Sequence, residues 1–411
     1  MPPILAPVDP LADSKANPRV HFAAGAIALL LTTVGLACWN LRMQSLERAS
    51  VWKLDAADTA FKEQSRALQL RAFEPANLVP FYGTSELEKP AGLKNRAPVF
   101  FRDHAAGFEV LSIGRMGGYP LAMAQQFASL GPALKDRKVV VCVSPSWFYF
   151  RDLIRPHYEG NFAPLHAAEF AFETHLSWST KHRMAQRMVE YPETLSRVPL
   201  TALALAQLAG DEWWRRITYW CVYPLGRLET SIRELQDHFE LRLKIEELAA
   251  VPGTRPAAGA DPLDWDELIA TARVKAGDSV EEPPATTEFD RHPAAHDAEF
   301  LANVEHSNQW EDLDLLLQVL KESGARPLIL SVPQNSLYAS QKGYSRAARE
   351  VVYQRLCSLA HRHGVAFRDF EEFDGDMHLL ADRHDHLSDL GWLYYCKAID
   401  DFYHDRMGAG R

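Results

Sequence analysis

The stretch Lys138–Val143 constrains the fold of this chain more than any other segment. It reads KVVVCV, a continuous β-branched run with no polar residue after its first position. Such a run is typical of a strand that is buried on both faces of a parallel sheet, whereas a strand with one solvated face alternates apolar and polar residues. The segment therefore predicts a parallel sheet that is covered on both sides.

Strand and helix patterns alternate around this run. Further strands are expected at Leu78–Tyr82, Phe108–Ile113, Pro327–Val332 and Val365–Phe370, and helices at 120–130, 310–323, 345–362 and the C-terminal end. This alternation predicts an α/β domain with a doubly wound parallel sheet. We assign the domain to residues 76–160 and 300–405.

The middle of the chain, 160–300, has a different composition. It is helical and aromatic to about Leu248, then rich in Pro, Gly and Ala (VPGTRPAAGADP), and finally acidic (DSVEEPPATTEFDRHP). This predicts a helical insert followed by a loose connection.

An aromatic cluster lies within this insert. Its members are Trp213, Trp214, Tyr219, Trp220 and Tyr223. The cluster predicts either a patch that faces lipid or a membrane partner, or the core of the insert.

The N-terminal segment Phe22–Trp39 decides the expected topology. Its eighteen residues carry no charge, which is about the minimum length for crossing a bilayer. No small-x-small cleavage site follows near Trp39, so an uncleaved anchor is favoured over a signal peptide. We expect a cytoplasmic tail at 1–20, a transmembrane anchor at 21–40 and a charged helical stalk at 41–75. The remaining chain is then expected outside the cytoplasm, on the cell (inner or plasma) membrane.

Charge and cysteine spacing exclude other classes of function. The net charge is −10 and no compact Lys/Arg stripe is present, which argues against a nucleic-acid partner. The five cysteines are scattered and show neither CxxC nor zinc spacing. We expect no cofactor and no metal.

Four polar segments follow expected strands, where ligands bind in a parallel sheet. They are Ser85, Gly117-Gly118, Ser144–Trp147 and 382–392. Ser85 comes after a strand and a glycine, at a predicted helix start whose N–H groups suit an oxyanion. The alternative is that Thr84 or Ser85 only caps the helix.

The segment 382–392, DRHDHLSDLGW, strengthens the first interpretation. A serine nucleophile needs a base within hydrogen-bond reach, and the base needs an orienting carboxylate. His386 and the neighbouring aspartates supply both. The alternatives are a solvated loop, or a metal site that also uses His378 and His384.

Several motifs together resemble the DltD family, the D-alanyl-lipoteichoic acid biosynthesis proteins. FYGTSELE is similar to the family's Gly-Ser-Ser-Glu segment, with Thr84 in place of a serine. KDRKVVVCVSPSWF resembles its strand ending in Ser-Pro-x-Trp-Phe, and SNQWEDLDLLL resembles its Ser-x-Glu-Tyr-x-Asp helix start. His386 followed by Gly391-Trp392 matches its His–Gly–Trp spacing. The resemblance implies a three-layer fold like that of SGNH/GDSL serine hydrolases.

The third member of the implied triad departs from the family pattern. The family's aspartate lies three residues before the histidine, where this chain has Arg383. We expect Asp382 to take this role, with Asp385 as the alternative, because adjacent side chains in an extended loop point apart. A Ser–His dyad is the remaining alternative.

The resemblance implies acyl transfer by an enzyme. Ser85 attacks an acyl ester or thioester, His386 takes its proton, and the acyl group passes to a hydroxyl. The N–H groups of Ser85 and Gly118, with Ser144 as a third group, are candidate oxyanion donors.

The resemblance also implies the reactants. D-alanine is the expected acyl group, a membrane-bound O-acyltransferase the partner, and an envelope glycan, polyol or teichoic acid the acceptor. The alternatives are an O-acetyltransferase or deacetylase of an extracellular polysaccharide, and a non-catalytic assembly factor that keeps the hydrolase fold.

Overall fold

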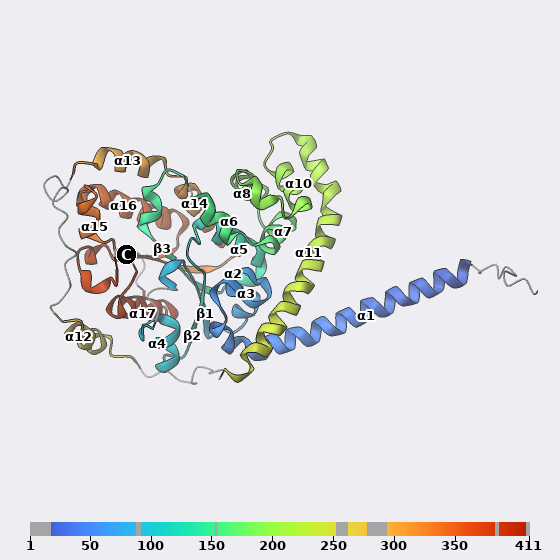
Figure 1. Cartoon of the computed structure of the whole chain (residues 1–411), viewed down its shortest axis with the longest axis horizontal. Coiled ribbons are helices and arrows are strands. Elements are labelled where there is room, and N and C mark those ends of the chain that lie inside the picture. Colours follow the sequence, from blue (N-terminus) through green and yellow to red (C-terminus); the bar gives the residue numbers. More distant parts are fainter. Residues whose placement is uncertain are drawn as a thin grey trace, which may run out of the picture. The chain divides into compact units, whose positions relative to one another are not determined.

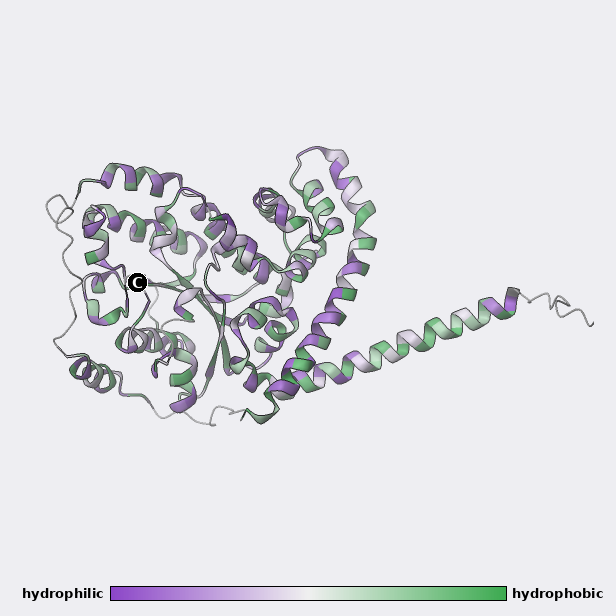
Figure 2. Ribbon diagram, viewed as in Figure 1, coloured by the Kyte–Doolittle hydropathy of each residue, from purple (hydrophilic) through white to green (hydrophobic). Residues whose placement is uncertain are grey.

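The computed structural model describes residues 18–87, 92–152, 154–251, 262–277, 294–382 and 386–407. The chain divides into two units, Met1–Leu46 and Glu47–Arg411. The described part of the first unit is helical and belongs to α1 (Pro18–Ser50), whose apolar residues are visible in Figure 2. Among the described residues, one helical stretch, Arg19–Ala56, is long and apolar enough to cross a membrane. The expected anchor at 21–40 lies within it.

The second unit contains a sheet of five strands in its described part (Figure 1). The strands are β1 (Leu78–Tyr82), β2 (Glu109–Ile113), β3 (Lys138–Val143), β4 (Arg326–Ser331) and β5 (Ala366–Arg368). They are all parallel and lie in the order β2-β1-β3-β4-β5. The predicted doubly wound parallel sheet is confirmed. Its strand order reverses between β1 and β3, which is where such sheets bind ligands.

Alternate residues of β3 point into two different apolar cores. Val139, Val141 and Val143 join the core beneath α5 (Pro120–Leu130), α14 (Gln309–Glu322) and α16 (Arg346–His363). Val140 and Cys142 join the core beneath α4 (Ala97–Asp103) and α17 (Asp389–Tyr403). Helices therefore cover both faces of the sheet, which explains why the strand has no polar alternation.

The segment 51–73 differs from the expected stalk. It forms η1 (Val51–Ala56), α2 (Thr59–Gln64) and α3 (Arg66–Ala72), and its apolar residues belong to the core of the second unit.

Two of the charged residues of the expected stalk are buried in ion pairs. Lys62 pairs with Asp55 at 3.2 Å, and Glu63 pairs with Arg115 at 2.6 Å. Lys62 and Glu63 are 3% and 1% exposed. Charged residues in this segment are therefore not a sign of solvent exposure, because some of them form buried ion pairs. A single sequence does not distinguish buried paired charges from exposed ones.

The middle of the chain is helical in its described part. The helices between β3 and β4 are α6 (Arg155–Asn161), α7 (Pro164–Phe172), α8 (Trp178–Met188), α9 (Pro192–Leu195), α10 (Pro199–Leu208), α11 (Trp213–Glu247), α12 (Trp265–Ala276) and α13 (Asp297–His306). Much of the predicted loose connection, at 252–261 and 278–293, lies outside the described residues.

Short helices complete the described chain. They are η2 (Ser85–Leu87), η3 (Gly131–Leu134), η4 (Pro145–Tyr149), η5 (Leu248–Ala250), α15 (Ser336–Gln341), η6 (Glu371–Phe373) and η7 (Met377–Leu379).

The aromatic cluster of α11 is divided between core and surface. Tyr219 is 1% exposed, and its hydroxyl donates to the carbonyl of Ala171 at 2.9 Å. Trp213, Trp214 and Trp220 are 74%, 46% and 53% exposed. One face of the helix therefore packs inward, as the core interpretation predicts, while the tryptophans form an outward patch.

Candidate active site

Ser85 stands in a tight turn directly after β1. Thr84 precedes it, and the buried Glu86 carboxylate accepts hydrogen bonds from the Thr84 N–H at 2.6 Å and from its hydroxyl at 2.8 Å. These two hydrogen bonds join the residues on either side of Ser85 and so stabilise the turn. Ser85 itself is half-buried, so its hydroxyl remains accessible at the sheet edge.

Two glycines of the loop after β2 make room for this turn. A Cβ on Gly114, whose φ is +135°, would lie 2.0 Å from the carbonyl oxygen of Gly83. A Cβ on Gly118 would lie 3.3 Å from the same oxygen. The Gly118 N–H, expected as an oxyanion donor, instead donates to the Arg115 carbonyl at 3.0 Å. In this conformation Gly118 contributes close packing rather than a donor.

His386 is carried by a short extended segment that leads into α17. Leu380 and Leu387 form an antiparallel bridge, and the Ala381 N–H donates to the His386 carbonyl at 2.7 Å. A Cβ on Gly391 would lie 2.2 Å from the Leu379 carbonyl oxygen, so only glycine lets the first turn of α17 approach this segment.

Trp392 joins the same segment to β1. It is fully buried, and its ring meets that of Phe81 edge-on, with the centroids 6.0 Å apart. The spacing from His386 through Gly391 to Trp392 therefore places the histidine against the strand that leads to Ser85.

The structure brings Ser85, His386 and Asp382 together in one hydrogen-bonded chain. Nε2 of His386 lies 2.9 Å from Oγ of Ser85, and Nδ1 lies 2.5 Å from Oδ2 of Asp382. Because a carboxylate only accepts, Nδ1 of the neutral ring carries the proton and Nε2 accepts from the serine hydroxyl. Asp385, the alternative carboxylate, lies outside the described residues, as do Arg383 and His384.

A pocket of about 540 Å³ opens beside this chain of groups. It is lined from the carboxyl ends of β1, β3 and β4, and Ser144, Ser85 and His386 are all part of its wall. The Ser144 hydroxyl lies 2.7 Å from that of Ser146 and accepts the Ser146 N–H at 3.3 Å. Gly117, rather than Gly118, reaches the pocket from the loop after β2.

Sequence reasoning missed several residues of this pocket. Tyr149 comes from η4 after β3, His157 from α6, and Gln334 follows β4. Burial lowers the pKa of His157, whose Nδ1 lies 3.2 Å from the Tyr119 hydroxyl. Gln334 could have been found, since it stands at a strand end in the same way as Ser85 and Ser144.

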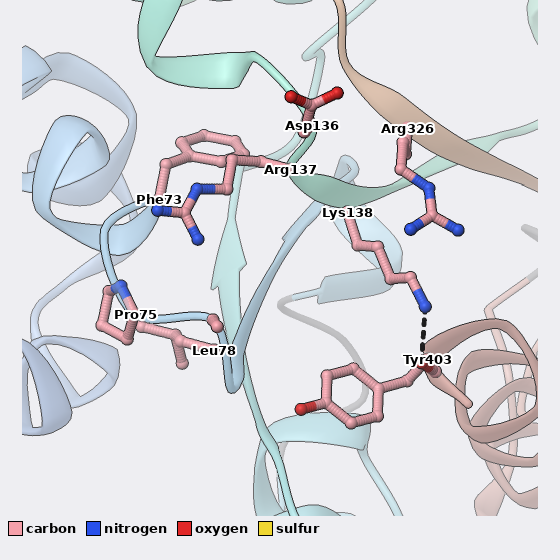
Figure 3. Close-up of a pocket in the computed structure, with 9 residues that line it drawn as sticks. Phe73, Pro75, Leu78, Asp136, Arg137, Lys138, Arg326 and Tyr403 are labelled. Atoms are coloured by element: carbon pink, nitrogen blue, oxygen red, sulfur yellow. Dashed lines mark hydrogen bonds between the residues drawn. The ribbon is translucent and has the colours of Figure 1, made fainter. Parts of the chain in front are cut away.

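A second pocket, of about 290 Å³, lies at the opposite, amino-terminal edge of the sheet (Figure 3). Lys138 and Arg326 are the first residues of β3 and β4 and line it together with Arg137 and Tyr403. Nζ of Lys138 donates to the carbonyl oxygens of Phe402 and Tyr403 and to Asp405, at 3.0, 2.5 and 2.9 Å. These contacts hold the end of α17 against β3.

Comparison with known proteins assigns the family. The family model described as "DltD protein" matches residues 57–404, a range that includes Ser85, Asp382 and His386. Protein DltD of Bacillus subtilis (strain 168) is 24% identical over 348 residues, which cover 83% of this chain and 86% of that protein. Protein DltD of Staphylococcus aureus (strain NCTC 8325 / PS 47) is 22% identical over 345 residues, which cover 81% and 82%. This chain belongs to the DltD family.

Proposed function

We propose that this protein is a membrane-anchored, extracytoplasmic O-acyltransferase that carries a D-alanyl group on Ser85 and transfers it to a hydroxyl of a cell-envelope glycan or polyol, such as a teichoic acid. The hydrogen-bonded chain from Ser85 through His386 to Asp382 carries this proposal. Membership of the DltD family supports D-alanine as the acyl group.

The first half of the proposed reaction acylates the serine. As Oγ of Ser85 attacks the carbonyl carbon of the acyl donor, its proton passes to Nε2 of His386. Asp382 stabilises the imidazolium that results. The departing alkoxide or thiolate then takes that proton, and the acyl group remains on Ser85 as an ester.

The second half transfers the acyl group. A hydroxyl of the acceptor attacks the ester carbonyl and gives its proton to Nε2 of His386. When the tetrahedral intermediate collapses, the proton returns to Oγ of Ser85 and the free serine is restored.

The oxyanion of both intermediates needs hydrogen-bond donors close to Ser85. We propose the Ser85 N–H, at the start of η2, and the Ser144 hydroxyl at the end of β3. Gly118 supports the site by letting its loop pack against Gly83.

The proposed location follows from α1. An apolar helix at the N-terminus suits a single-pass anchor in the cell membrane. With the second unit outside the cytoplasm, Ser85 would meet both the envelope acceptor and a membrane-bound O-acyltransferase partner that delivers the acyl group.

Ser85→Ala tests the proposal in cells that receive labelled D-alanine or a labelled acetyl donor. We expect D-alanine to reach the envelope with the unchanged protein and transfer to stop in the variant. Ser358→Ala serves as the control, because the Ser358 side chain is exposed and its hydroxyl donates within its own helix, to the Gln354 carbonyl. Normal acylation in the Ser85 variant would refute the catalytic role, and transfer of the acetyl label would favour the O-acetyltransferase alternative.

A further inference from the structure

Gln334 presents an unusual buried amide in the wall of the active-site pocket. The residue is 1% exposed and lines the pocket directly after β4. Its Oε1 accepts a hydrogen bond from the hydroxyl of Tyr149. Among the residues that the structure describes, its Nε2 has no hydrogen-bond partner. Buried amide donors are normally paired, so an unpaired one in a residue of the pocket wall is a candidate contact for a ligand.

The surroundings fix the orientation of this amide. The Gln334 N–H donates to Oδ1 of Asp374 at 2.8 Å, which holds the backbone. The ring of Tyr149 packs edge-on against Phe300 and Tyr344, with centroid distances of 4.8 and 6.1 Å. Because the hydroxyl of this ring donates to Oε1, the NH₂ group is the end of the amide that has no partner among the described residues.

The position of Gln334 separates it from the oxyanion site. β1 and β4 are separated by β3, so the strand that precedes Gln334 lies about 10 Å from the strand that leads to Ser85. Its neighbour Asn335 donates through Nδ2 to the carbonyl oxygen of Asp382 at 3.4 Å. Gln334 therefore lies on the His386 side of the pocket, where an acceptor hydroxyl must bind to give up its proton.

The nearby wall suits a polyhydroxylated molecule. Aromatic residues of this wall include Trp147, Tyr149, Tyr338 and Tyr344. Flat aromatic faces combined with a few placed hydrogen-bonding groups give orientation to a ligand in such a pocket.

From these observations we propose that Nε2 of Gln334 donates a hydrogen bond to an oxygen of the polyhydroxylated acceptor, and that Tyr149 orients the amide for this contact. The inference rests on the proposed function. Its ligand is a polyol oxygen, which either a neutral glycan or a polyol-phosphate chain can supply.

Binding measurements on the full chain in detergent test this inference without requiring catalysis. All variants carry Ser85→Ala, and two probes are titrated separately, a neutral hexosamine oligosaccharide and a glycerol-phosphate oligomer. At a pH where its carboxylate is ionised, Gln334→Glu keeps the shape and the oxygen that accepts from Tyr149 and has no donor. We expect it to raise Kd about tenfold or more for the probe that binds, which also identifies the source of the polyol.

Two further variants make the result specific. Tyr149→Phe leaves the donor but loses its orientation, so a smaller rise in Kd is expected. Gln354→Glu, at an exposed site on α16, should leave Kd unchanged. An unchanged Kd in both Gln334→Glu and Tyr149→Phe, or binding of neither probe, would overturn the inference.

Active-site labelling separates this result from failure of the proposed function. With Ser85 restored, a fluorophosphonate probe should label Ser85 equally in the Gln334→Glu chain and its parent. If the variant lost both Ser85 labelling and acceptor binding, Gln334 would be needed for the structure of the whole active site. That result would contradict a role specific to the acceptor. Failure to label Ser85 in the parent chain would instead count against the proposed nucleophile.

Discussion

The two edges of the same sheet carry pockets with opposite chemistry. At the amino-terminal edge, the three N–H donors of the Lys138 ammonium meet three oxygens from the end of α17 and the residues after it, and Figure 3 draws the contact with Tyr403. At the carboxyl edge, the half-buried Ser85 hydroxyl lies 2.9 Å from Nε2 of His386, a base that can remove its proton, and Nε2 of the buried Gln334 has no hydrogen-bond partner among the described residues. A pocket with polar walls is therefore not by itself evidence of an active site.

The difference has a physical origin in helix polarity. The last carbonyls of α17 are negative and attract a cation, so the amino edge uses Lys138 to fasten a helix end. The carboxyl edge instead leads into the turns that carry Ser85 and Ser144. Substitutions at the carboxyl edge should change the reaction, and those at the amino edge should change stability.

The largest effect is expected from His386→Ala. Without a base, the Ser85 hydroxyl keeps its proton, and we expect acyl transfer to fall by about a thousandfold or more. The rate of fluorophosphonate labelling of Ser85 measures this loss directly. A fall of less than tenfold would mean that another group activates the serine.

Asp382→Asn should have the next largest effect on rate. An amide no longer fixes the proton on Nδ1 or stabilises the imidazolium, so a fall of about a hundredfold or more is expected while the chain stays folded. The same labelling rate provides the measurement. An unchanged rate would support a Ser–His dyad, or a role for Asp385.

Lys138→Met should separate the two edges. It removes the cation that bonds the end of α17, and we expect a loss of stability of about 1 kcal/mol with labelling of Ser85 within about twofold. Urea unfolding and labelling are measured on the same sample. A large loss of labelling at unchanged stability would contradict the structural role of this edge.

Asp405→Asn should give the smallest effect, and one that depends on pH. Hydrogen bonds from Lys138 and Arg326 lower the pKa of Asp405 below its ordinary value of 3.8. A lowered pKa in the folded state stabilises the protein above pH 3.8, and this contribution is lost as pH falls through the lowered pKa. The variant should therefore unfold at lower urea than the parent at neutral pH, and the difference should shrink as the pH falls below 3.8. A difference that stays constant as the pH falls would rule out this charge effect.

Local patterns predicted much of the fold. The observed bounds of β1, β3 and α5 coincide with those expected from the sequence, because continuous apolar runs and a proline at a helix start are strong local signals. The packing of segment 51–73 could not be predicted, because its buried charges find partners that are distant along the chain, such as Arg115 for Glu63.

The residues of the candidate site also include some that the sequence predicts and some that it does not. Ser85, His386 and Asp382 each carry a signal in the sequence, as a strand-end serine, a His–Gly–Trp spacing and a nearby carboxylate. The pairing of Gln334 with Tyr149 carries none, since it joins residues 185 apart that follow neighbouring strands. The donor role of Gly118 was inferred from position alone, and the hydrogen bond of its N–H to Arg115 could not be foreseen.

The most direct test is mass spectrometry of the protein during transfer. The chain is incubated with its acyl donor, quenched in acid and digested, with His386→Ala as the comparison. We expect one D-alanyl group on the peptide that contains Ser85, and none in the comparison. Continued D-alanyl transfer with no adduct on Ser85, or with an adduct on a different residue, would contradict the serine mechanism.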